Sequence, residues 1–422
     1  MADEPHQASA TDLAAAPLAS ADAPTADAST AERARSALRA AQRSDIDPFI
    51  VMDVMRSAAA REAEGHKVIH LEVGQPSTKA PAAALARARS ALDSDPLGYT
   101  LATGMPALRE RIAQLYQDWY GVSVSPQRIV ITNGSSAAFT LAFLAAFDVG
   151  DRVALPSPGY PCYRHILSAL GQQPMALETD ASTRWMPDIE RLAQSHATSP
   201  LRGLLLASPN NPTGTMLSAE RLQALITWCG HEGLWFISDE IYHGLHFDTA
   251  AQTALATSQD VIIINSFSKY FSMTGWRVGW MVVPEVLIRT VERLAQNLFI
   301  CAPAISQHAA LGAFDGIDEL EANRAVYAAN RSMLLERLPT LGFTDLVPSD
   351  GAFYLYADVS AFSDDALAFA QRMLHETGVA VTPGLDFDAA RGHRFVRFSF
   401  ARDTAHIAEG LDRLGDWDAL KR

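Results

Sequence analysis

The sequence predicts an α/β protein whose large domain holds a mainly parallel β-sheet flanked by helices. The first observation is a series of short, continuous apolar runs, which are typical of strands buried on both faces of a sheet. The second is that helical patterns such as 137–147 and 219–231 separate these runs, as a parallel sheet requires. The expected strands are 128–132, 152–155, 203–207, 234–238 and 261–265.

A change of pattern beyond about residue 314 predicts a second, smaller α+β domain. A long amphipathic helix is followed by a strand, a helix and a further strand, which we expect at 319–338, 351–355, 364–376 and 394–400. We expect the N-terminal segment to join this small domain together with the C-terminal third. The predicted boundaries are 44–80 for that segment, 81–315 for the large domain and 316–422 for the small domain.

Residues 1–43 differ in composition from the rest of the chain. They consist largely of Ala, Ser, Thr, Asp and Pro, which are too poor in large apolar groups to bury a core. We expect a disordered acidic tail, with a short helix at most over 30–42. The first thirty residues hold no Lys or Arg, whereas a mitochondrial presequence is rich in Arg.

Overall composition excludes several classes of protein. The 34 Lys plus Arg stand against 48 Asp plus Glu, a net charge of −14, so a nucleic-acid partner is not expected. No apolar stretch is long enough for a membrane span, and no secretory signal begins the chain. The three cysteines form no pair typical of a disulfide framework or zinc site. We therefore expect a cytoplasmic protein with no membrane partner and no metal, in which His243 and His246 are ordinary polar residues.

Polar groups follow the expected strands, at the edge of a parallel sheet where ligands bind. Ser135 and Ser136 come after strand 128–132 and open a helix. Free backbone N–H groups and hydroxyls at a helix start suit a phosphate, although they equally suit a plain helix cap. Three later strands end in the polar segments 208–214, 239–242 and 266–269.

Lys269 lies at one of these strand ends. A lysine in that position is most often a surface charge, but its neighbours here point to a ligand. Ser266, Ser268 and Arg277 supply hydroxyl and guanidinium donors for a phosphate, beside an amine that can form a Schiff base. This combination favours pyridoxal phosphate as the cofactor.

Four further residues can contact the same cofactor. A carboxylate at Asp239 can pair with the protonated ring nitrogen, which keeps the ring in its electron-withdrawing state. Tyr242 and Asn211 can hydrogen-bond the phenolic oxygen, and Tyr160 offers a ring to stack on the pyridine. A lone Tyr is more often part of a core than of a cofactor site.

With these motifs the sequence resembles the fold-type I, class I pyridoxal-phosphate-dependent aminotransferases. The segments that carry the resemblance are 208–214 (SPNNPTG), 238–242 (SDEIY), 266–269 (SFSK) and 273–277 (MTGWR), in the order and spacing of that family. The resemblance covers nearly everything from about residue 46 to the C-terminus. It implies that Lys269 holds the cofactor covalently and shuttles the proton. The other implied cofactor contacts are Asp239, Asn211, Tyr242 and Tyr160 around the ring, and Ser135, Ser136, Ser266, Ser268 and Arg277 at the phosphate.

The same resemblance assigns three more residues. Arg397 stands where the family keeps the arginine that grips the substrate α-carboxylate, although by itself it could equally be a strand arginine. Gly74 resembles the glycine whose backbone meets that carboxylate. Tyr99 resembles the tyrosine that reaches the partner subunit's phosphate site, which implies an obligate homodimer.

The implied activity is transfer of an amino group from an L-amino acid to a 2-oxo acid by a ping-pong mechanism. Two alternatives remain open from the sequence. The same scaffold can direct the chemistry to β-elimination, which would make the protein a lyase. It can also serve as the effector-binding half of a transcription regulator, but a tail of about 43 residues is too short for a DNA-binding domain.

Three further observations concern the substrate and the loops around it. Segment 296–303 is apolar where a side-chain pocket is expected, which hints at neutral or aromatic amino acids with Phe299 in the pocket. Arg293 and Lys79 are the candidates for a second carboxylate of a dicarboxylic substrate. Asp388 stands where many relatives carry Gly, so the loop around it is expected to differ.

Overall fold

The computed structural model describes residues 39–344 and 346–421. The chain divides into two units, 1–45 and 46–422, and the described part of the first contains one short 3-10 helix, η1 (Gln42–Ser44). Most of the expected acidic tail, and of the short helix expected at 30–42, lies outside the described residues. All that follows concerns the second unit.

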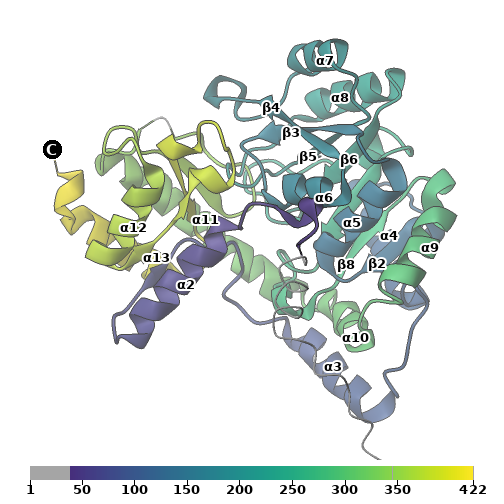
Figure 1. Ribbon diagram of the computed structural model, residues 1–422. Helices are drawn as coiled ribbons and strands as arrows, with labels where there is room; N and C mark the ends of the chain where they lie inside the picture. Colours follow the sequence, from purple (N-terminus) through teal and green to yellow (C-terminus); the bar gives the residue numbers. More distant parts are fainter. Residues whose placement is uncertain (1–38, 345, 422) are drawn as a thin grey trace, which may run out of the picture. The chain divides into compact units, whose positions relative to one another are not determined.

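A seven-stranded sheet forms the centre of the large domain (Figure 1). Its strand β8 runs antiparallel to both neighbours, β2 and β7, whereas the remaining pairs are parallel. The five expected strands are confirmed, and β4 and β8 are additional. In spatial order the strands are β2 (Ile129–Thr132), β8 (Gly279–Val282), β7 (Ile262–Ser266), β6 (Trp235–Asp239), β5 (Gly203–Ala207), β3 (Arg152–Ser157) and β4 (Gln173–Glu178).

Helices bury both faces of this sheet, which explains why its strands are continuously apolar. In β5, Leu205 packs in the core cluster that contains Phe143 of helix α5 (Gly134–Ala146). Its neighbour Leu204 packs in the other cluster, with Leu222 of helix α8 (Ala219–His231). The other helices of the large domain are α3 (Ala82–Ser94), α4 (Pro106–Tyr120), α6 (Cys162–Leu170), α7 (Ile189–Thr198), α9 (Ile288–Leu298) and α10 (Ala304–Ala313).

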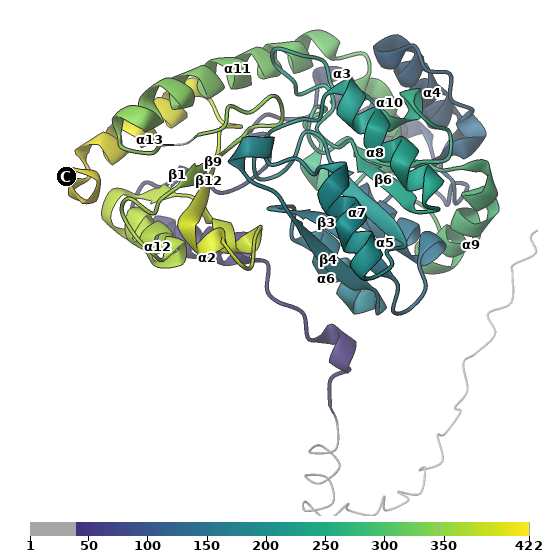
Figure 2. The ribbon, with the colours of Figure 1, turned by 90° about the horizontal axis from the view of Figure 1, so that it is seen from above.

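The small domain combines the N-terminal segment with the C-terminal third. Strand β1 (Ile69–His70) pairs in parallel with β10 (Val379–Ala380). A second, antiparallel sheet has the order β11 (Thr382–Pro383), β12 (Phe395–Ser399) and β9 (Tyr354–Asp358). The helices are α2 (Ile50–Ala63), α11 (Ile317–Thr340), α12 (Ala366–Thr377) and α13 (Thr404–Asp416), of which α11 runs from the large domain along the small one (Figure 2). The boundary near residue 315 stays a prediction.

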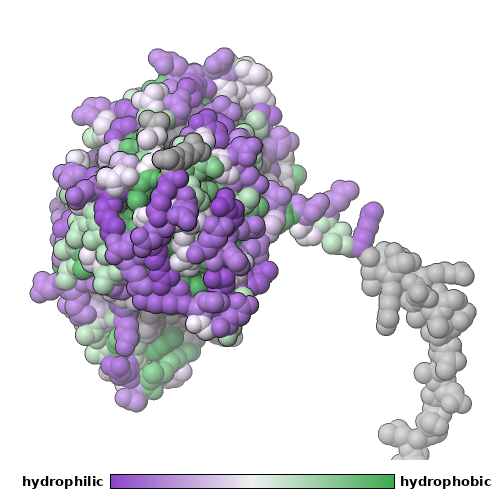
Figure 3. All heavy atoms as spheres, turned by 90° about the vertical axis from the view of Figure 1, so that its left-hand side faces the viewer, coloured by the Kyte–Doolittle hydropathy of each residue, from purple (hydrophilic) through white to green (hydrophobic). Residues whose placement is uncertain are grey.

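The face of the small domain in Figure 3 carries mainly hydrophilic residues, and its hydrophobic ones are scattered. In the described ranges of the chain, no helix has both the length and the apolar character that a membrane crossing needs.

Glu240, the residue directly after strand β6, places a carboxylate in the core. Glu240 is fully buried, and its Oε1 accepts hydrogen bonds from the Ser238 and Thr253 hydroxyls and the Ala254 N–H. Its Oε2 has no hydrogen-bond partner among the described residues and lies 3.5 Å from Nδ1 of His243. Burial raises the pKa of Glu240 to about 8 and lowers that of His243 to about 3, so both groups are neutral at pH 7.

This burial predicts a pH effect on stability. Between pH 4.5, the ordinary pKa of a glutamate, and about 8, the unfolded chain releases a proton that folded Glu240 keeps. The free energy of unfolding therefore falls as the pH rises through this window. We expect Glu240→Gln to be more stable than wild type at pH 8, by roughly 4 kcal/mol, and within about 1 kcal/mol of it at pH 5. Urea denaturation at several pH values measures this. Glu336→Gln, on the exposed side of α11, is the control, and parallel pH curves for wild type and Glu240→Gln would contradict the prediction.

Candidate active site

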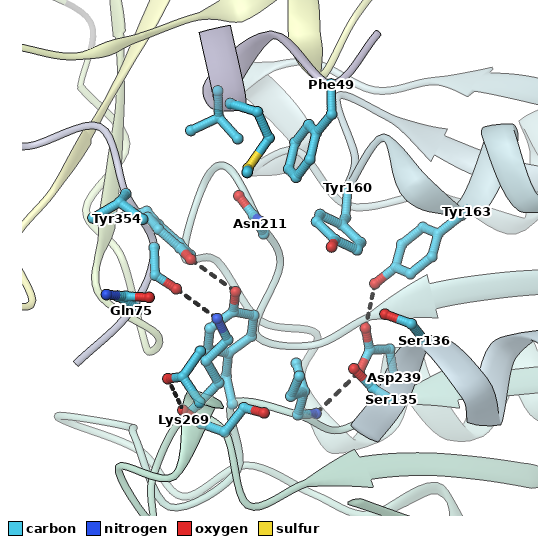
Figure 4. Close-up of a pocket in the computed structure, with 18 of the residues that line it drawn as sticks. Phe49, Gln75, Ser135, Ser136, Tyr160, Tyr163, Asn211, Asp239, Lys269 and Tyr354 are labelled. Carbon is cyan, nitrogen blue, oxygen red and sulfur yellow. Dashed lines mark hydrogen bonds between the residues drawn. The ribbon is translucent and has the colours of Figure 1, made fainter. Parts of the chain in front are cut away.

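A cavity of about 200 Å³ lies where strands of the large sheet end, and residues of the small domain complete it (Figure 4). Strand β8 runs opposite to its two neighbours, so β2 is parallel to β7, and the carboxyl ends of β2, β5, β6 and β7 meet at one edge. Eleven of the residues predicted from the sequence line the cavity: Gly74, Ser135, Ser136, Tyr160, Asn211, Asp239, Tyr242, Ser268, Lys269, Arg277 and Arg397.

Lys269 follows the end of β7, and its Nζ donates a hydrogen bond to the backbone oxygen of Gly74. Removal from water lowers the pKa of Lys269 to about 8, and the positive charges of Arg397 and Arg277 act in the same direction, whereas Asp239 opposes them. About a tenth of the amine is therefore unprotonated at pH 7, far more than for an ordinary lysine. Lys269 can act as a nucleophile and as a base.

Asp239 ends strand β6 and is 3% exposed. The Tyr163 hydroxyl donates to its Oδ2, and the Ile241 N–H donates to its Oδ1 over 3.1 Å. Burial raises the pKa of Asp239 to about 6, although both hydrogen bonds and Lys269 favour its charged form. The carboxylate is thus ionised at pH 7 and can hold a protonated ring nitrogen. Tyr163 was not predicted as a site residue. The one indication in the sequence was its position three residues after Tyr160, which was predicted to contact the cofactor.

An anion site is built where helix α5 begins. Asn133, the N-cap residue, makes no side-chain capping bond, and Ser135 and Ser136 lie in the first turn. The Arg277 guanidinium sits against this turn, because a Cβ on Gly134 would lie 2.3 Å from its Nη2. Free N–H groups, hydroxyls and a guanidinium together suit a phosphate.

Arg397 comes from strand β12 and is buried. Its Nη1 donates to Asn211 Oδ1 over 2.8 Å, and its Nη2 donates to the backbone oxygen of Glu72. The rings of Tyr354 and Phe387 contact the guanidinium, with centroids at 4.3 and 4.8 Å. Its buried Nε has no acceptor among the residues that the structure describes. The guanidinium can therefore still accept an anionic ligand.

Two tyrosines close one side of the cavity. The hydroxyls of Tyr242 and Tyr354 are hydrogen-bonded over 2.9 Å, and both side chains are buried. A Cβ on Gly74 would lie 1.9 Å from the Tyr354 hydroxyl, so only glycine fits there. Tyr354 was missed from the sequence, where it is one of several aromatic residues in an apolar run.

An apolar wall lines part of the cavity, and Phe49, one of its members, lies across the cavity from Lys269 (Figure 4). We use this name for four side chains at the start of α2: Phe49, Val51, Met52 and Met55. None of them was predicted as a site residue, because the segment offered no motif.

Other predicted residues do not line this cavity. Ser266 is buried behind it, hydrogen-bonded to Ser268 over 2.9 Å. Tyr99 is 85% exposed, and Phe299 is half-buried after α9. Of the candidates for a second carboxylate, Arg293 is exposed on α9 and Lys79 lines a separate hollow. Their roles stay predictions.

His243 and His246 do not line the cavity, and their interpretation as ordinary polar residues stays a prediction. His243 is buried, with Nδ1 2.6 Å from the Tyr120 hydroxyl and Nε2 2.9 Å from the Ser208 backbone oxygen. Within the described part of the chain, no group of three or more His, Cys, Asp and Glu side chains could hold a metal ion.

The cavity fits pyridoxal phosphate by the chemistry of its donors. It offers an amine of lowered pKa, a buried carboxylate for the ring nitrogen, and an anion site at a helix start. Gly134 leaves open the space that the Arg277 guanidinium fills.

Comparison with known proteins agrees with this fit. Residues 66–414 match the family described as aminotransferase class I and II. The chain is 50% identical over 383 residues to a valine–pyruvate aminotransferase of Mycobacterium tuberculosis, covering 90% of this chain and 98% of that one.

Solved structures give the same result. A crystal structure of an aminotransferase from Mycobacterium tuberculosis has a TM-score of 0.88 at 50% identity, covering 90% of this chain and 99% of that one. Aspartate aminotransferase from Thermus thermophilus with maleate has a TM-score of 0.85 at 30% identity, covering 90% and 100%. None of these relatives is named a lyase or a transcription regulator. The chain therefore belongs to the class I and II aminotransferase family and is a pyridoxal-phosphate-dependent enzyme that transfers amino groups between amino acids and 2-oxo acids.

Proposed function

We propose that this aminotransferase prefers amino acids with small apolar side chains. The observation that carries the proposal is the apolar wall of Phe49, Val51, Met52 and Met55, which lines the same cavity as Lys269. In the described ranges, the basic residues that line the cavity are Lys269, Arg277 and Arg397. They are already assigned to the cofactor and proton, the phosphate and the α-carboxylate, respectively. A second carboxylate would thus meet no free cation of this subunit. The name of the valine–pyruvate relative supports the same substrate class.

In the proposed site, the first turn of α5 with Ser135 and Ser136 would hold the cofactor's phosphate together with Ser268 and Arg277, and Ser266 orients Ser268 by its hydrogen bond. Around the ring, Asp239 would pair with the protonated nitrogen, Tyr160 would pack against the ring, and Asn211 and Tyr242 would bind the phenolic oxygen. When bound, pyridoxal phosphate withdraws electrons from Cα of the amino acid, which makes the Cα proton acidic.

The protein's own groups then handle the substrate. Arg397 takes the α-carboxylate through its fork of N–H donors, and the backbone of Gly74, whose oxygen accepts a hydrogen bond from Lys269, contributes to the same subsite. Lys269 Nζ accepts the Cα proton and returns one in the reverse half of the cycle. Its pKa of about 8 suits transfer in both directions near neutral pH.

We also propose a homodimer in which Tyr99 reaches the partner's phosphate site. Tyr99 and Leu101 are large apolar side chains exposed by 85% and 59%. A hollow of about 760 Å³ opens beside Arg277, between Lys79 and Trp276, and offers room for a partner side chain. The free cysteines Cys162, Cys229 and Cys301 support a location in the reducing cytoplasm.

The substrate class predicts the outcome of a half-reaction test. Purified yellow enzyme is mixed with single L-amino acids, and conversion to the amino form of the cofactor is followed by absorbance. We expect L-valine and L-alanine to convert it with a kcat/KM at least about tenfold above that of L-aspartate or L-glutamate, since a buried unpaired carboxylate is costly. Lys269→Ala is the control and should show no conversion. A dicarboxylic acid as the best donor would refute the apolar preference.

Because the Arg277 guanidinium packs against the start of α5, we expect position 134 to require glycine. Gly134→Ala places a Cβ 2.3 Å from Arg277 Nη2, so the guanidinium must move and the affinity for pyridoxal phosphate should fall about tenfold or more. The control is Gly121→Ala, whose φ of +66° carries comparable backbone strain with no atom within 4 Å of the new Cβ. Equilibrium dialysis of both variants measures the affinity. Equal losses would show that backbone strain alone is responsible.

A shared site predicts complementation between two inactive subunits. In a hybrid of Lys269→Ala and Tyr99→Ala subunits, one site carries both defects and the other carries neither. Mixing the unfolded variants and refolding them together should therefore give activity well above the sum of the two parents. Refolding each variant alone is the control. No gain, with hybrid dimers demonstrated by tagged subunits, would contradict the role of Tyr99.

A further inference from the structure

Helix α2, which carries the apolar wall, begins without a local cap. The first N–H groups of a helix lack partners within it, and Ser, Thr, Asp or Asn normally supply one. The N-cap residue here is Phe49, which makes no side-chain capping bond. Instead, the backbone N–H groups of Ile50 and Val51 both donate to the carboxylate of Asp386, each over 3.0 Å. The cap is thus 336 residues away from Ile50 along the chain.

Asp386 is itself held firmly. It is fully buried at the end of the 3-10 helix η7 (Gly384–Asp386), between β11 and β12. Arg164 of the large domain donates to its backbone oxygen over 2.9 Å. Burial raises the pKa of Asp386, whereas the two α2 amides and the nearby charges of Arg397 and Arg164 favour its charged form. An anion at a helix start is also favoured by the helix dipole.

This anchor joins two parts of the substrate site. One residue after Asp386, the ring of Phe387 contacts the Arg397 guanidinium at 4.8 Å. On the other side, the first turn of α2 carries Val51, which is 5% exposed, and Phe49 precedes it with its ring 5.9 Å from that of Tyr160. A single segment therefore contacts both the carboxylate-binding arginine and the apolar wall.

We propose that Asp386 is a positioning residue for substrate choice, because it holds the apolar wall at a set distance from Arg397. This rests on the proposed preference for apolar amino acids. An amino acid whose side chain reaches the wall binds well only while α2 is anchored. Alanine, whose side chain is a single methyl group, does not depend on the wall.

Asp388 provides a matched control two residues further on. It is 4% exposed, and its Oδ1 accepts from the N–H groups of Ala390 and Arg391, each over 3.1 Å. Its Oδ2 accepts from Arg391 Nε over 2.9 Å. Asp388 is therefore an equally buried carboxylate that orders its own loop, and among the described residues its hydrogen bonds do not involve α2.

The first arm of the test measures the anchor directly, by amide hydrogen exchange in the cofactor-loaded enzyme. We expect Asp386→Ala to speed exchange in peptides covering 49–53 by about tenfold, and Asp386→Asn, which keeps one acceptor, to do so less. Asp388→Asn should leave these peptides unchanged. Unchanged exchange in both Asp386 variants overturns the proposal. If Asp386→Ala does not fold, the exchange rate of Asp386→Asn alone decides.

The second arm measures substrate choice through KM and kcat. In Asp386→Asn or Asp386→Ala we expect the KM for L-valine to rise about tenfold, with kcat changed less than about threefold and the KM for L-alanine nearly constant. Equal rises for both amino acids would overturn the proposal, since they would indicate general damage to Arg397. If wild type itself does not discriminate among donors, the proposed substrate class fails, whereas the exchange arm still decides whether Asp386 holds α2.

Discussion

The chemistry of this site depends on the burial of opposite charges in one cavity. Loss of water lowers the pKa of Lys269 to about 8 and raises that of Asp239 to about 6, so both pKa values lie close to pH 7, one above it and one below it. The attraction between the two groups favours the charged form of each, so Asp239 stays ionised at pH 7, whereas burial and the positive charge of Arg397 are what free part of the Lys269 amine. A solvent-exposed lysine and aspartate would be fully charged and less useful for proton transfer.

The sheet and the small domain share the task of holding these charges. Parallel strands bring Asp239 and Lys269 to one edge, and the strand that interrupts the parallel order, β8, leaves β2 and its phosphate site on the same side. Arg397 comes from the small domain, yet Asn211 of the large domain accepts one of its hydrogen bonds. The complete site therefore exists only when the two domains are assembled.

Most of the cofactor side of the site could be predicted because its residues follow buried strands. A strand buried on both faces is visible as an apolar run, and the polar residues after it must lie at the sheet edge. Ser135, Asp239 and Lys269 were found in this way. Tyr163 and Tyr354 were not, because their partners Asp239 and Tyr242 lie 76 and 112 residues away in the sequence.

By itself the sequence determined the α/β class, the positions of five buried strands along the chain and the aminotransferase motifs, since these depend on residues close together in the chain. Only the tertiary structure decided how the substrate pocket is walled. Segment 50–63 contains no local cap to mark a helix start, and its cap, Asp386, lies in the small domain. A hydrogen bond across that separation leaves no periodicity in the sequence, because it forms only after the N-terminal segment and the C-terminal third have folded together into the small domain.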